Sequence, residues 1–225
     1  MKRYFLAAGV GGLLVSLVPA VLAAGVCVVK PSGCPEYEVL NKSFPPGKVT
    51  IITRDLSVQQ QQWVQNAINA LNGSGPAASA GVTFGLSSSR VSGDVGYVSM
   101  AFPGNTDTGS AGDTRQYRSP SSPNETQHAD VNVYLNTSCS TGSCFDPSQA
   151  AAFQAAVQGV IEHELLHTLG LGDTVDPTAQ DIMAPFRGMN NSAGTRSLSP
   201  CNSSGVSKAK QSRSTGNGGQ CVRKP

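Results

Sequence analysis

The chain has 225 residues, of which 39% are hydrophobic and 13% charged, and its formal net charge at pH 7 is +2. This length and apolar content fit one ordinary domain with attached segments and argue against a second full domain. The small net charge, taken as a total, indicates no particular class of partner.

The beginning of the chain has the pattern of a secretory signal peptide over residues 1–23. A basic start at Lys2 precedes an apolar run from Phe5 to Val18, and cleavage is expected after Ala23 or Ala24. An uncleaved membrane anchor is disfavoured because the apolar run is short for a span and rich in glycine. We therefore expect a secreted protein, extracellular or periplasmic, with no membrane contact once the signal is removed.

Residues 24–47 contain several Pro and Gly residues and are interpreted as an N-terminal arm. Beyond the arm, β-branched and alternating segments predict strands, and a polar stretch without a regular pattern predicts a long loop. The predicted strands are Lys48–Arg54, Val82–Leu86, Gly96–Phe102 and Asp130–Asn136, and the loop runs from Pro103 to about Gln127.

The first predicted helix follows the first strand. Ser57 and Gln60 form a capping box that opens it, and Gly73 is its expected stop. Apolar residues recur at helical spacing between these limits, so the helix is expected to pack on a sheet.

The second predicted helix runs from about Pro147 to Leu169, with Asp146 as its cap and Gly170 as its left-handed stop. Apolar residues cover most of its surface, and we expect it to be largely buried. One polar stripe, interpreted as the solvent-facing side, is formed by Gln154, Gln158 and Glu162.

Three polar residues lie away from that stripe. At about 100° per residue, Glu164 points roughly 160° away from Glu162, and His163 and His167 share a face beside it. Buried ionisable groups without partners are costly, and a metal ion satisfies all three. The HExxH spacing places two imidazoles on one ion while the carboxylate reaches the metal-bound water. We predict one catalytic zinc ion held by His163 and His167, with Glu164 as general base.

Such a zinc site needs a third protein ligand. No glutamate follows Glu164, and the only histidine outside the motif is His128. The residues alone therefore leave four candidates, namely His128, Asp173, Asp176 and Asp181.

Other polar residues are considered for calcium binding and for oxyanion stabilisation. Asp107 and Asp113 have neither the spacing nor the carboxylate density of a calcium loop, so a calcium site is not supported. Tyr97, Tyr117 and Tyr134 are candidates for stabilising an oxyanion, and no spacing selects one of them.

The segment His163–Asp173, HELLHTLGLGD, resembles the metzincin consensus HExxHxxGxxH/D in a matrixin-like or snapalysin-like form. Gly170 matches the glycine of the sharp turn after the helix, and Asp173 matches the third ligand. Met183 resembles the Met-turn that lies beneath the metal in that family. The resemblance implies that Asp173 completes the zinc site.

The resemblance also implies an α+β fold, that of a metzincin-like zincin in which a twisted mixed β-sheet packs on two long helices and the active-site helix carries HExxH. It implies an antiparallel edge strand that binds an extended substrate, for which Asp130–Asn136 is the matching segment. The expected partner is a protein or peptide substrate. No nucleic-acid partner is expected, and the protein is expected to be a monomer.

The predicted function is that of a secreted zinc-dependent endopeptidase. The competing hypothesis is a non-catalytic secreted binding or adhesion module that keeps zinc for stability. Glu164 favours the enzyme, because a structural site has no need of a general base beside an open coordination position. The predicted segments are the signal peptide at 1–23, the arm at 24–47, the metallopeptidase catalytic domain at 48–189 and a tail at 190–225.

The tail from residue 190 is rich in Ser, Gly and Asn and is expected to be irregular apart from a disulfide loop. From Arg187 onward the chain has seven basic residues and no acidic or aromatic ones, which favours a solvated basic tail over a nucleic-acid surface. Six cysteines in an exported chain favour disulfides. Their clustering suggests three local pairs, Cys27–Cys34, Cys139–Cys144 and Cys201–Cys221.

Overall fold

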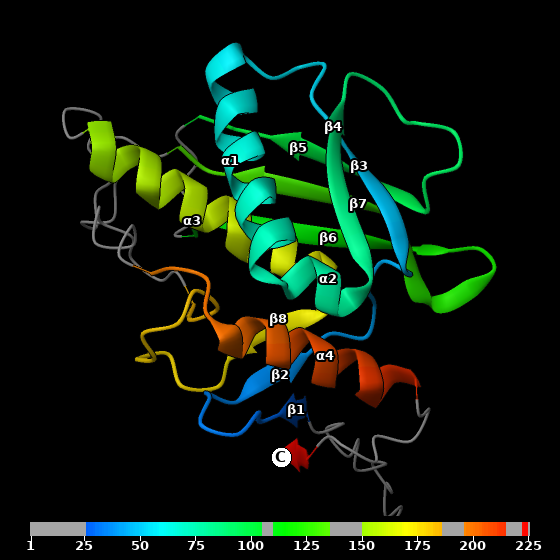
Figure 1. Ribbon diagram of the computed structural model, residues 1–225, viewed down its shortest axis with the longest axis vertical. Coiled ribbons are helices and arrows are strands. Elements are labelled where there is room, and N and C mark those ends of the chain that lie inside the picture. Colours follow the sequence, from blue (N-terminus) through cyan, green and yellow to red (C-terminus); the bar gives the residue numbers. More distant parts are fainter. Residues whose placement is uncertain (1–25, 105–109, 136–149, 186–195, 215–221, 225) are drawn as a thin grey trace, which may run out of the picture.

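The computed structural model describes residues 26–104, 110–135, 150–185, 196–214 and 222–224 (Figure 1). Its strands form a five-stranded and a four-stranded sheet. Two long helices lie side by side over one face of the five-stranded sheet, and another helix lies against the four-stranded sheet (Figure 1). The helices are α1 (Val58–Ser74), α2 (Pro76–Ala80), α3 (Ala150–Thr168) and α4 (Pro200–Ser214).

The five-stranded sheet has the order β4-β3-β5-β7-β6 and is parallel except for the β6–β7 pair. Its central strands bury apolar residues on one face, as expected for a parallel sheet covered by helices. The strands predicted near residues 48, 82 and 96 are confirmed. The strands are β3 (Gly47–Ile52), β4 (Val82–Ser87), β5 (Gly96–Ala101), β6 (Gly112–Ser119) and β7 (Ser122–Val133).

The capping box predicted at the start of α1 is confirmed. The backbone N–H of Gln60 donates to Ser57 Oγ (3.3 Å), and the backbone N–H of Ser57 donates to Gln60 Oε1 (2.9 Å). The predicted stop at Gly73 is wrong, because the helix continues to Ser74 and the left-handed residue is Gly75 (φ 98°).

The loop predicted from Pro103 to Gln127 is wrong for most of its length, because β6 and the first part of β7 form an antiparallel pair there. The β6 sequence, GDTRQYRS, has no apolar alternation. Instead, Gln116 Nε2 donates to the backbone carbonyl of His167, and the Thr114 hydroxyl bonds to Glu164, both on α3. Polar contacts thus replace the apolar contacts that make a half-buried strand recognisable in a sequence.

The segment predicted as the antiparallel edge strand, Asp130–Asn136, is not at an edge. Its first four residues belong to β7, which lies between β5 and β6, and residue 136 is outside the described residues. The antiparallel edge strand is β6, because the hairpin folds β6 back along the outer side of β7.

The four-stranded sheet has the order β8-β2-β1-β9, and all its pairs are antiparallel. It joins the arm, the segment after α3 and the end of the chain. Arm residues Val29 and Tyr37 are fully buried, so the arm is part of the folded body. The strands are β1 (Val26–Val29), β2 (Tyr37–Val39), β8 (Leu171–Thr174) and β9 (Val222–Lys224).

The fold class expected from the sequence, a metzincin-like zincin with one twisted mixed sheet on two long helices, is therefore wrong. The described residues contain four helices and two sheets. The difference arises because the arm and the tail, which carry no strong periodicity, form strands of their own: β2 of the arm pairs with β8, and β9 of the tail pairs with β1 of the arm. Their hydrogen bonds build the second sheet.

Helix α4 lies in the tail that the sequence predicts to be irregular. It is rich in Ser, Asn and Gly, which are weak helix formers. Val206 and Ala209 are fully buried, and a Cβ at Gly205 would approach Leu171 and Tyr37 within 3.1–3.2 Å. Tertiary packing therefore stabilises a helix that its own propensity does not favour.

The tail is also not simply solvated. The guanidinium of Arg213 donates to the carbonyls of Leu169 (3.2 Å) and Gly170 (3.0 Å), at the end of α3. Burial lowers the pKa of Arg213 to about 10. Lys210 Nζ donates to the carbonyl of Ala80, the last residue of α2 (2.9 Å). Both cations bind carbonyls that a helix end leaves without a partner inside the helix.

A disulfide joins Cys34 in the arm to Cys201 at the start of α4. Cys27 is also disulfide-bonded. Sequence proximity is misleading here, because the arm and α4 pack together. Two of the proposed local pairs are therefore wrong, Cys27–Cys34 and Cys201–Cys221, and the third, Cys139–Cys144, lies outside the described residues.

The main hydrophobic core lies between the five-stranded sheet and helices α1 and α3. Its central side chains have no solvent exposure, as at Ile51, Val64, Val98 and Leu165. Within the described residues, no helix has both the length and the apolar character needed to cross a membrane.

Replacing both Cys34 and Cys201 by alanine should lower the free energy of unfolding by roughly 2–4 kcal/mol, because the cross-link restricts a long loop of the unfolded chain. Denaturant unfolding under non-reducing conditions measures this loss. Peptide mapping of the unreduced protein should recover a linked Cys34–Cys201 peptide, and recovery of a Cys27–Cys34 peptide instead would contradict the arrangement.

Candidate metal centre

The C-terminal end of α3 brings together His163, Glu164 and His167, which form a group that could hold a metal ion. One potential ligand atom from each residue lies within 4.8 Å of the others. His163 and Glu164 are buried, and His167 is half-buried. The surrounding helix is apolar, with no exposure at Val160, Ile161, Leu165 or Leu166. Three polar side chains are thus held in an apolar environment, as the sequence predicts.

The left-handed stop predicted at Gly170 is confirmed, with φ at 87°. The positive φ favours glycine, and a Cβ at this residue would displace the Arg213 guanidinium. The chain then enters β8, which returns Asp173 to the histidines. The predicted helix start, Asp146 and Pro147, lies outside the described residues.

Backbone carbonyls orient the two imidazoles. His163 Nδ1 lies 2.8 Å from the carbonyl oxygen of Ile182, and His167 Nδ1 lies 2.8 Å from that of Leu171. A carbonyl oxygen only accepts, so each Nδ1 carries the proton and donates it. Each Nε2 of a neutral ring then presents a lone pair, which is the arrangement that second-shell carbonyls give to metal-binding histidines.

Asp173 directs a carboxylate oxygen at the same point. Its Oδ1 lies 3.3 Å from His163 Nε2 and 3.7 Å from His167 Nε2. Tetrahedral zinc, with bonds of about 2.0–2.2 Å, places neighbouring ligand atoms roughly 3.3–3.5 Å apart. The two distances from Asp173 Oδ1 are close to this spacing, which favours one ion shared by the three residues.

The charges of this group also call for a cation. Burial lowers the pKa of His167, and the neighbouring His163 lowers it further, so the neutral form of this ring is favoured. Two imidazole lone pairs and a carboxylate oxygen then converge on one point. A positive ion at that point would be attracted by all three atoms.

Strand β6 positions Glu164 beside the two histidines. Thr114 Oγ1 donates to Glu164 Oε2 at 2.7 Å. A Cβ at Gly112 would lie 2.6 Å from Glu164 Oε1, so the carboxylate occupies the space that this glycine leaves free. Burial raises the pKa of Glu164 to about 7, while His167 and the Thr114 hydroxyl act in the opposite direction.

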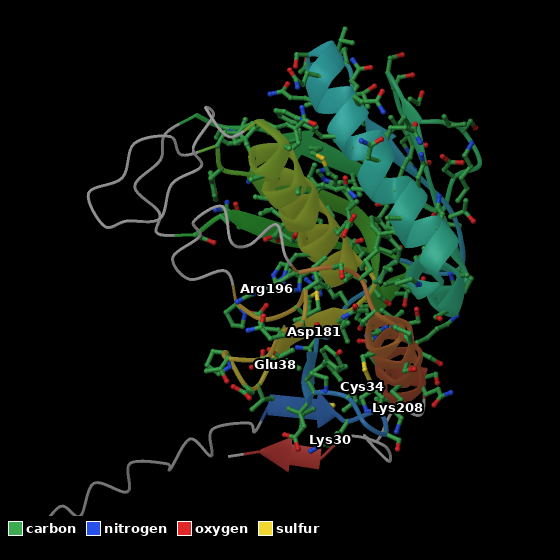
Figure 2. The ribbon with its side chains drawn as sticks, turned by 60° about the vertical axis from the view of Figure 1, so that its left-hand side comes forward. Lys30, Cys34, Glu38, Asp181, Arg196 and Lys208 are labelled. Atoms are coloured by element: carbon green, nitrogen blue, oxygen red, sulfur yellow. A yellow bond between two sulfur atoms is a disulfide. The ribbon has the colours of Figure 1, made fainter. Side chains whose placement is uncertain are left out.

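The turn that contains Met183 positions His163, because the backbone carbonyl of Ile182 in this turn accepts a hydrogen bond from His163 Nδ1. Met183 is fully buried, and its backbone N–H donates to Asp181 Oδ1 (2.8 Å). Asp181 also accepts from Tyr37 Oη (2.9 Å) and Asn202 Nδ2 (3.0 Å). Figure 2 shows Asp181 on the segment below α3, between the two sheets. Asp181 thus anchors the turn.

His128 and Asp176, like Asp181, are engaged away from the histidine pair. His128 lies on β7, where its Nε2 is 2.8 Å from Asp130 Oδ1 and 3.0 Å from Ser99 Oγ. Asp176 closes an exposed turn by accepting from Thr178. Of the four candidate third ligands, Asp173 is the one whose oxygen lies beside both Nε2 atoms.

Each tyrosine considered for oxyanion stabilisation interacts with a neighbouring side chain. Tyr134 donates to Asp113, and Tyr117 donates to Asp130. Burial and the Asp113 carboxylate raise the pKa of Tyr134 to about 12. Tyr97 stacks on the His128 ring. Asp107 lies outside the described residues.

The solvent-facing role expected for Glu162 is wrong. Gln154 is exposed, but Glu162 is only 5% exposed, and burial raises its pKa to about 7. The segment at residues 196–198 lies beside this face of α3, and the helical periodicity carries no information about a neighbour so distant in sequence.

Three residues near the candidate centre could not be identified from the sequence. Gly112 and Thr114 lie in β6, whose sequence has no strand pattern. Glu38, on β2, is half-buried and lies opposite Gly172, and burial together with the charge of Asp173 raises its pKa. Figure 2 places Glu38 in the lower half of the molecule. None of the three has a motif or a spacing that indicates its position.

Comparisons with known proteins give little further information. No protein-family model and no curated protein matches the chain. Among solved structures, "GM1 bound form of the ECX AB5 holotoxin" contains a chain that is 14% identical, with a TM-score of 0.45. The match covers 82% of this chain and 88% of that chain. At this similarity it carries no conclusion about fold or function.

Replacing Asp173 by asparagine should weaken zinc binding at least about tenfold, because the exchange removes the negative charge nearest both imidazoles. Competition with a chromophoric chelator measures the affinity. Asp176→Asn is the matched control on the same segment and should bind zinc as the wild type does. Equal affinities for both variants would show that Asp173 is not a ligand.

Proposed function

We propose that the protein is an exported zinc-dependent endopeptidase, in which His163, His167 and Asp173 hold the ion and Glu164 is the general base. The observation that carries the proposal is the convergence of two lone-pair nitrogens and one carboxylate oxygen beside a separate buried carboxylate. The HExxHxxGxxD motif, with its resemblance to the metzincins, supports the same roles for these residues.

Zinc is the ion that this ligand set favours, because two imidazoles and one carboxylate form a common three-ligand catalytic site. When bound, it supplies a Lewis acid that activates water and polarises a substrate carbonyl. The chain's own groups prepare the site for it. Two backbone carbonyls fix the imidazole tautomers, and the turn after Gly170 brings in the carboxylate.

Glu164 takes the proton of the attacking water and returns it to the leaving amine. Burial raises the pKa of Glu164 to about 7. A positive ion beside it would lower this pKa and favour the ionised base. Thr114 keeps Oε2 engaged, so the base stays in one orientation while Oε1 remains on the Gly112 side. This arrangement favours an enzyme over a module that keeps zinc for stability.

An extended peptide is the substrate that the surroundings favour. Strand β6 is an edge of its sheet and, within the described residues, pairs only with β7. Its residues Gly112 and Thr114 contact the general base directly. A peptide added along the outer edge of β6 would therefore run past Glu164, held by sequence-independent main-chain hydrogen bonds.

Export fits the signal-like pattern at residues 1–23 and the disulfide between Cys34 and Cys201, since such bonds persist in oxidising compartments.

The Glu164→Gln variant should bind one zinc per chain and lose hydrolysis of a protein substrate such as casein by roughly 10²- to 10⁴-fold, because the amide cannot accept the proton. Elemental analysis and a fluorescent casein assay measure the two properties. Asp55→Asn, at an exposed residue far along the chain, is the control and should retain activity. Full activity of Glu164→Gln would exclude the assigned base.

Thr114→Val should lower kcat by roughly ten- to a hundredfold with little change in KM, since it removes a hydrogen bond to the charged base and preserves the side-chain shape. Thr114→Ser restores the hydroxyl and should recover most of the rate. If the serine variant is as slow as the valine variant, Thr114 has a packing role only.

A further inference from the structure

A hollow of the molecule lies on the side of α3 that carries Glu162. It is a cavity of about 550 Å³ between α1, α3 and the segment that begins at Arg196. Figure 2 shows Arg196 beside the C-terminal half of α3. Its volume is within the range of small-molecule sites. Small side chains leave this space between the helices, and those lining it include Ala70, Gly73, Ala155 and Gly159.

Glu162 gives this cavity a carboxyl group. The residue lines the cavity and is only 5% exposed. Gln158 Nε2 donates to its Oε1 at 2.7 Å, and no other described residue bonds to the carboxylate. None of the ion pairs between described residues includes Glu162.

Arg196 lines the same cavity but forms no ion pair with Glu162. Its Nη1 donates to the carbonyl of Ala184 at 2.9 Å. A carboxylate that is buried without a cation is costly, and the cavity leaves room for a positive group to reach it.

We propose that this cavity is a binding site for a small organic cation, an amine or an amidine, with Glu162 as its charged anchor. Carboxylates form their strongest hydrogen bonds with charged N–H donors. A metal ion is a poor occupant, because one carboxylate and one amide do not supply the oxygen ligands that a hard cation requires. The small residues on α1 and α3 accommodate the apolar body of the ligand, and Asn69 and Gln158 supply polar contacts at its rim.

Benzamidine and its neutral isostere benzamide test the proposal by isothermal titration at pH 8. Benzamidine should bind with a Kd near or below about 1 mM, and benzamide at least about tenfold more weakly. Glu162→Gln should weaken benzamidine binding at least about tenfold. The assay requires no turnover, so its result is independent of the proposed peptidase activity.

Two variants make the result specific. Gly73→Leu keeps the carboxylate and fills the cavity, since nothing lies within 4 Å of a Cβ at Gly73, and it should also abolish binding. Glu38→Gln removes the half-buried carboxylate near Asp173 and should leave binding unchanged. The proposal is overturned if benzamidine does not bind, if Glu162→Gln and Gly73→Leu both bind normally, or if Glu38→Gln alone abolishes binding.

Discussion

The last turns of α3 bury ionisable side chains. Such groups are costly to bury without partners, and distant parts of the chain provide partners here. The carbonyls of Ile182 and Leu171 accept from the two imidazoles, and Thr114 donates to Glu164. These partners come from a turn, from β8 and from an edge strand. The geometry of the candidate metal centre therefore depends on the whole fold, although His163, Glu164 and His167 all lie on α3.

The arm and the tail contribute to this support. Tyr37 from β2 and Asn202 from α4 both donate to Asp181, which in turn holds the Met183 turn. Arg213 binds the carbonyls at the end of α3, where the chain must turn sharply to return Asp173. The disulfide between the arm and α4 links the two segments that provide these contacts. The four-stranded sheet and α4 thus act as a scaffold beneath the centre.

The features that could be predicted from the sequence are those set by neighbouring residues. The Ser57 capping box and the Gly170 stop depend on a few adjacent residues, and both are present. The features that could not be predicted depend on distant partners. β6 is held by polar bonds to α3, and α4 is stabilised by burial despite weak propensity. Cys34 pairs with a residue 167 positions away, which clustering along the chain cannot reveal.

Glu162 and Glu164 lie on the same helix, and the cost of burying a carboxylate is offset differently for each. Both carboxylates are buried, and burial is the main reason why the pKa of each is raised to about 7. On the Glu164 side, the histidines, a threonine hydroxyl and a point suited to a metal ion offset the cost of the charge. On the opposite side, Glu162 has one amide partner and an adjoining cavity. Because the chain supplies the partners of Glu164 and leaves space beside Glu162, the first carboxylate is suited to chemistry and the second to recognition of a cation.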